Sequence, residues 1–154
     1  MTMGGFADLL SRLQSLDGTE LTVGIQGEVA PGDVGLPEMV EIATTHEFGL
    51  GVPMRPFLRT SLRKKGKRWA RGLREVARRW TRGEYSQSER AMRRVAVVAV
   101  GDVQATIRDE NWVPNSPATI ARKGSDKPLI DTGQLRQSIR AAAVLPSGET
   151  EAMG

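Results

Sequence analysis

The sequence lacks the residues that most often build metal and redox sites. Its 154 residues include no cysteine and one histidine, His46. No disulfide or thiolate metal site can form, and a single histidine without a second nitrogen or sulfur ligand does not complete an ordinary zinc site. We therefore expect no metal and no other cofactor.

Long apolar runs are also absent. No stretch approaches the roughly 20 apolar residues that cross a bilayer, and the start, "MTMGGFADLL", lacks the basic and then apolar pattern of a secretion signal. We expect a protein made in the cytoplasm, with no membrane partner. The length predicts a single domain over residues 1–145, and the composition of residues 146–154 is typical of a flexible tail.

Hydrophobic periodicity predicts an α+β fold. Residues 21–25 alternate apolar and polar side chains, which is typical of a half-buried strand. Residues 57–82 and 86–109 repeat apolar side chains at helical spacing, and residues 138–145 are a candidate partner for the first strand. We expect two long amphipathic helices packed on a small antiparallel β-sheet, with extended loops between the elements.

The triplet Asp-Thr-Gly at Asp131 raises the question of an aspartic protease. That chemistry needs two carboxylates that share a proton, supplied by two copies of the triplet or by a symmetric dimer. Here Gln134 follows at the spacing of a capping box, and Leu135 and Ile139 follow at helical spacing. Asp131 is therefore interpreted as a structural helix cap, and we expect no enzymatic activity.

Two prolines flank Arg55 in "GVPMRPFL". Pro53 and Pro56 favour an extended backbone, because proline fixes its own φ and biases the residue before it away from the helix. This pattern predicts that Arg55 is presented outward as a subunit contact. It also predicts that Phe57 anchors the start of the helix in the core or in a neighbouring subunit. A simple lead-in to the helix is the alternative.

Two stretches together resemble a known family. "ATTHEFGLGVPMRPFLRTSL" and "WVPNSPATIARKGSDKPLIDTGQLRQSI" are similar to the signatures of tail-completion or neck proteins of long-tailed double-stranded DNA bacteriophages, often described as phage virion morphogenesis proteins. The resemblance implies a structural virion protein that forms a ring, with six copies expected, at the head–tail junction or tail end. It implies contacts with itself, with head–tail connector or adaptor proteins and with tail-tube proteins. The residues expected at these interfaces are His46, Glu47, Phe48, Arg55, Phe57, Arg59, Trp112, Arg122 and Lys123.

The basic helix 57–82 supports three interpretations. Its cations could neutralise DNA phosphates, they could be a solvated face, or they could meet acidic residues of a neighbouring subunit. The leading alternative function is therefore a nucleic-acid-binding protein, and packaged DNA is a candidate partner. The residues expected at this contact are Arg63, Lys64, Lys67, Arg68 and Arg71, with Glu20, Glu28, Asp33, Glu38 and Glu41 as candidates for the opposing acidic patch.

Overall fold

The computed structural model describes residues 3–26, 35–123 and 133–153. The chain is α+β, as predicted, with a small antiparallel sheet and two helices of 25 residues each. The elements in chain order are α1 (Met3–Gln14), β1 (Glu20–Ile25), α2 (Leu36–Phe48), α3 (Phe57–Thr81), α4 (Tyr85–Asp109), α5 (Pro117–Lys123), α6 (Gln134–Gln137), β2 (Ile139–Val144) and β3 (Thr150–Met153).

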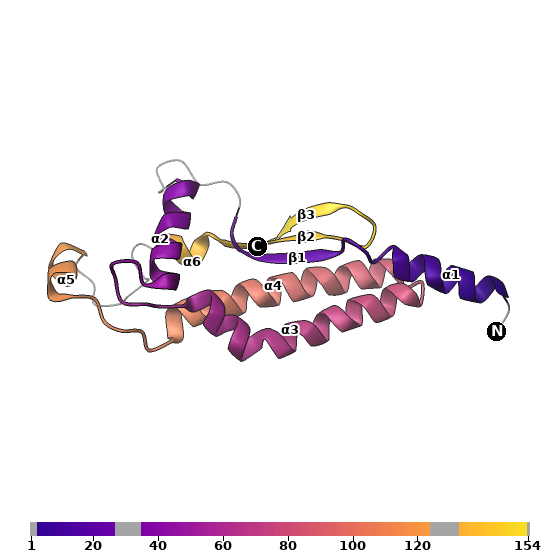
Figure 1. The fold of residues 1–154 in the computed structure, drawn as a ribbon, viewed down its shortest axis with the longest axis horizontal. Helices are drawn as coiled ribbons and strands as arrows, with labels where there is room; N and C mark the ends of the chain where they lie inside the picture. The colour runs from indigo at the N-terminus through magenta and orange to yellow at the C-terminus, as the bar shows by residue number, and fades with distance from the viewer. Residues whose placement is uncertain (1–2, 27–34, 124–132, 154) are drawn as a thin grey trace.

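The long helix α4 lies between the sheet and α3. Figure 1 shows the sheet on one side of α4 and α3 along the other side. α2 stands beside the sheet, near the start of α3 and the end of α4. The chain reverses between α3 and α4 at Gly83, whose φ of 79° is readily adopted only by glycine. The molecule is consequently elongated, and its two ends carry different elements.

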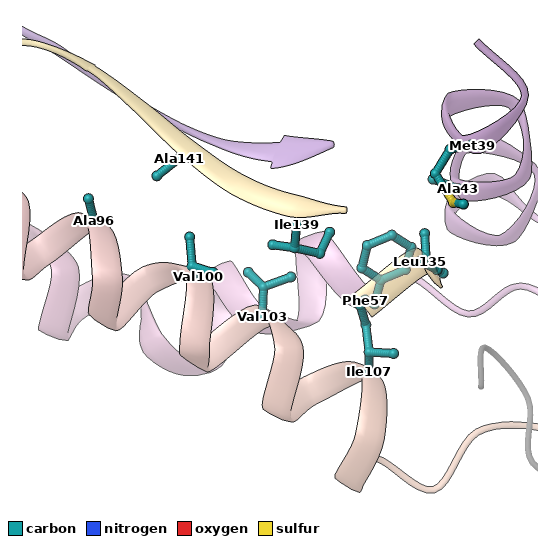
Figure 2. Close-up of a cluster of buried hydrophobic side chains, with 10 residues drawn as sticks. All are labelled: Met39, Ala43, Phe57, Ala96, Val100, Val103, Ile107, Leu135, Ile139 and Ala141. Atoms are coloured by element: carbon teal, nitrogen blue, oxygen red, sulfur yellow. The ribbon is translucent and has the colours of Figure 1, made fainter. Parts of the chain in front are cut away.

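The two long helices form where the periodicity predicts because their apolar stripes pack against each other and, for α4, against the sheet. The apolar repeat expected over 86–109 is buried in α4, and its buried side chains include Met92, Val95, Ala96, Ala99, Val103 and Ile107. In Figure 2, Ile139 and Ala141 of β2 point toward Ala96, Val100 and Val103 of α4. Small alanines at this contact let the sheet approach the helix closely.

The sheet has the order β1-β2-β3, and both pairs are antiparallel. The predicted pairing of the first strand with the segment near its C-terminal end is confirmed, with Leu21 opposite Ala143 and Ile25 opposite Ile139. Leu135 and Ile139, which were expected to anchor the segment after the Asp-Thr-Gly triplet, are both buried.

The predicted flexible tail over 146–154 is wrong for Thr150–Met153. These residues form β3, which pairs with β2 after a tight turn at Gly148. Glu151 pairs with Arg93 at 2.7 Å, and Met153 packs against the core. Composition alone missed this strand because it is only four residues long and is stabilised by pairing with β2.

Candidate functional site

The segment between α2 and α3 makes two sharp turns. Gly49 ends α2 with φ 71°, and Gly51 follows with φ 74°, so both adopt the left-handed conformation that favours glycine. A side chain at Gly49 would also meet Cβ of Met54 at 2.9 Å. The two glycines therefore fold the chain back, so that Met54 lies against the end of α2.

Arg55 clamps this turn to the segment that follows α4. Its Nε and Nη2 atoms donate to the carbonyl oxygen of Val113 at 3.0 and 2.8 Å. Nη2 also donates to the Pro114 carbonyl at 3.2 Å and to Asn115 Oδ1 at 3.1 Å. Nη1 lies 3.1 Å from His46 Nδ1, which must accept because a guanidinium has no acceptor. One side chain thus joins the two stretches that carry the family resemblance.

The outward presentation predicted for Arg55 is wrong. The side chain is 2% exposed, and burial lowers its pKa from the usual value. No carboxylate is hydrogen-bonded to it among the described residues; its partners are neutral oxygens and one imidazole nitrogen. The fork of the guanidinium satisfies several carbonyl groups that loops would otherwise leave unpaired. Arg55 therefore holds two loops of the same chain together.

Glu47 caps the start of α3. Its carboxylate oxygens accept from the backbone N–H groups of Leu58 at 3.0 Å and Arg59 at 3.1 Å, where the helix has unpaired donors and a partial positive charge. Glu47 is buried, and Phe57 is fully buried in the core. The prediction that these two residues contact a neighbouring subunit is therefore wrong, and the core alternative for Phe57 is confirmed.

Three large apolar side chains surround the same turn and face solvent. Phe48 and Leu50 are each 59% exposed, and Met54 is 55% exposed. The guanidinium of Arg59 lies over the Phe48 ring at 4.9 Å and reaches Met54 Sδ at 3.8 Å, so it holds two of them in place. We call Phe48, Leu50 and Met54 the apolar rim. Sequence reasoning missed Leu50 and Met54, although the flanking glycines and prolines marked a structured turn.

The remaining expected interface residues have mixed placements. His46 and Trp112 are half-buried, and the Trp112 indole donates to the Ile107 carbonyl at 3.2 Å. Arg122 and Lys123 occupy the last turn of α5. Asp131 lies outside the described residues; the following helix α6 has Gly133 at its N-cap position and no side-chain cap bond.

The cations of α3 fall into two groups. Lys64 pairs with Glu110, and Arg68 pairs with Asp102 at 3.3 Å, so these two expected contact residues are engaged within the subunit. Within the described part of the chain, the other group makes no ion pair or side-chain hydrogen bond: it contains Lys65 and four further cations, Arg63, Lys67, Arg71 and Arg74. We consider these four together. Their spacing of four, four and three residues places them on one helix face.

A shallow groove between α3 and α4 has a volume of about 250 Å³. Its polar lining consists of Arg68, Arg94 and Glu75. A hydrogen bond from Arg78, together with its charge and that of Arg79, keeps the pKa of Glu75 below its usual value. The groove therefore offers a carboxylate that is already paired, not a free acid or base.

Across residues 3–26, 35–123 and 133–153, no three side chains of His, Cys, Asp or Glu group closely enough to hold a metal ion. Among the same residues, no helix has the length and apolarity needed to cross a bilayer. Comparison with protein-family models, curated sequences and solved structures finds no match to this chain.

Proposed function

We propose that this chain is a structural virion protein of the phage head–tail junction or tail end. In this proposal, copies of the chain form a ring, with six as the expected number, that completes the tail and connects it to the DNA-filled head. Its partners are further copies of itself, head–tail connector or adaptor proteins and tail-tube proteins. It is made in the cytoplasm of the host bacterium and ends in the neck or tail of the virion.

The main support for the proposal is the apolar rim. Three large apolar side chains more than half exposed around one turn are typical of a protein–protein contact. The rim belongs to the first stretch that resembles the phage proteins, and Arg55 fastens it to the second stretch. A buried clamp that fixes an apolar surface suits a rigid subunit interface, since a pre-organised surface loses little entropy on binding.

Self-association tests this proposal. We expect the purified wild-type chain to form ring-shaped oligomers with rising concentration, as measured by sedimentation velocity and negative-stain electron microscopy. Phe48→Ser combined with Leu50→Ser should keep the circular dichroism spectrum and remain monomeric. Val97→Ser is the matched control, because Val97 is 61% exposed on α4 and outside the rim.

Three results would contradict this proposal. A wild-type chain that stays monomeric at all concentrations contradicts the ring. Rings formed equally well by the double variant contradict the role of the rim. Loss of association in Val97→Ser as well contradicts a contact that is specific to the rim.

A nucleic-acid-binding protein is the second candidate, favoured by the unpaired cations on α3. Such binding would release counterions from DNA and would weaken steeply with salt. Fluorescence anisotropy with generic duplex DNA across a salt series tests it. Tight, salt-sensitive binding by the monomer favours this function, and no binding together with concentration-dependent oligomers favours the ring.

A further inference from the structure

Charge is divided unevenly between α3 and the rest of the chain. The helix carries ten lysines and arginines and one acidic residue, Glu75, which gives a net charge of +9. The whole chain has 22 basic and 18 acidic residues, so the remainder has 12 and 17 and a net charge of −5. One copy therefore presents a strongly basic helix on an otherwise acidic protein, and copies can attract one another in a fixed orientation.

The outer face of α3 carries a row of cations. Arg63, Lys67, Arg71 and Arg74 lie in one row along the helix, and the side chains that pack inward, such as Trp69 and Val76, are on the opposite side. With a rise of 1.5 Å per residue the row is about 16 Å long. No acidic side chain of the described residues pairs with these four cations.

The outer face of α2 carries the opposite charge. Glu38 and Glu41 are exposed, lie on the side away from the buried Met39 and Ala43, and make no ion pair among the described residues. Phe48 follows them at helical spacing, seven residues after Glu41, so the same face continues into the apolar rim. Acidic and apolar contacts thus form one surface, which we call the α2 face.

Glu38 and Glu41 form no ion pair with the cationic row within one copy of the chain, although the apolar rim lies beside the start of α3, where Arg59 contacts Phe48 and Met54. Figure 1 shows α2 on the sheet side of α4, whereas α3 lies along the opposite side of α4. Two different patches on one chain are what a head-to-tail contact requires, and repetition of such a contact gives a ring when the rotation between copies closes.

We propose that the cationic row on α3 of one copy docks on the α2 face of the next copy. The inference rests on the proposed ring and names the two surfaces that form its contact. Ion pairing would neutralise Glu38 and Glu41 against the row, and the adjoining rim would be covered at the same time. A second copy fits better than DNA, because the rest of the chain, with a net charge of −5, repels phosphates and attracts the row.

Charge reversal on each surface tests the contact. Variant A is Lys67→Glu with Arg71→Glu, and variant B is Glu38→Lys with Glu41→Lys. Each variant alone would face like charges across the contact, and we expect its self-association to weaken about 100-fold or more. An equimolar mixture of A and B restores opposite charges at every contact, so sedimentation velocity should show mixed oligomers that neither variant forms alone.

A control variant carries the change of charge of variant B elsewhere. Glu20 and Glu149 are exposed at the β1 start and in the β2–β3 turn, outside the proposed contact. Glu20→Lys with Glu149→Lys should associate like the wild type. If it loses association too, the effect is one of net charge, and the proposed contact is wrong.

Three further results distinguish the proposed contact from the ring itself and from nucleic-acid binding. Rings formed by the wild type and equally by variant A would overturn this contact but leave the proposed ring intact. A wild type that never associates would contradict the ring itself. If variant A associates normally but loses binding to duplex DNA, the cationic row is a nucleic-acid surface and not a subunit contact.

Discussion

At the residue scale, the buried cation of Arg55 connects two loops of the chain. The guanidinium bridges two loops by donating to oxygens of Val113, Pro114 and Asn115, and it is held on the other side by His46. A buried charge without a carboxylate partner is tolerated when every donor finds an acceptor. The rim depends on this clamp because Met54 directly precedes Arg55 in the same turn.

Replacement of Arg55 should therefore destabilise the monomer. We expect Arg55→Ala to lower the free energy of unfolding by about 3 kcal/mol, because several buried oxygens lose their donor. Arg55→Lys should recover little of this loss, since an ammonium cannot reproduce the planar fork. Urea unfolding followed by circular dichroism measures both. Arg71→Ala, at an exposed arginine without a partner, should change stability by less than about 0.5 kcal/mol, and an equally small effect of Arg55→Ala would contradict the clamp.

At the scale of elements, the fit between α3 and α4 depends on one glycine. A Cβ atom at Gly72 would approach Cγ2 of Val95 to 2.4 Å, so the two helices are close at this point. Gly101, on the exposed side of α4, would place its Cβ in open space. The same residue type thus has different roles in the two helices, and helical periodicity cannot distinguish them.

Alanine at the two glycines should have opposite effects. Gly101→Ala should raise the free energy of unfolding by about 0.5–1 kcal/mol, because alanine loses less conformational entropy in a helix. Gly72→Ala should lower it by about 1–3 kcal/mol, because the helices must separate or Val95 must change rotamer. Thermal unfolding of both variants provides the measurement, and stabilisation by Gly72→Ala would mean that Val95 adapts at no cost.

At the scale of the whole molecule, the layers separate charge. α4 lies between α3 on one side and the sheet on the other, with α2 on the sheet side, and the cationic row of α3 forms no ion pair with Glu38 or Glu41 among the described residues. This arrangement leaves both surfaces to other molecules. α1 adds a further apolar surface at the opposite end from the rim, where Phe6, Leu10 and Leu13 are exposed.

Salt should weaken the proposed association. The Debye length falls from about 10 Å at 0.1 M to about 3 Å at 1 M, so we expect the dissociation constant to rise at least about tenfold over that range of sodium chloride. Lys67→Ala with Arg71→Ala should flatten this dependence, because two of the screened charges are then absent. Analytical ultracentrifugation measures both series, and association that strengthens with salt would indicate a contact made by the apolar rim alone.

The sequence determined the features of this protein that depend on local pattern. The two long helices, the first strand and the buried stripe of α4 could be predicted, because each follows from the spacing of apolar residues. The rim was predicted only in part, through Phe48. The α+β class follows from these elements.

Only the tertiary structure decided the roles that depend on distant partners. Arg55 is buried because Val113 and Asn115, far along the chain, supply its acceptors, and β3 exists because β2 lies beside it. Glu47 is a cap because α2 ends beside the start of α3. Exposure, ion pairing and strand pairing are properties of neighbours in space, and neither local propensity nor composition specifies those neighbours.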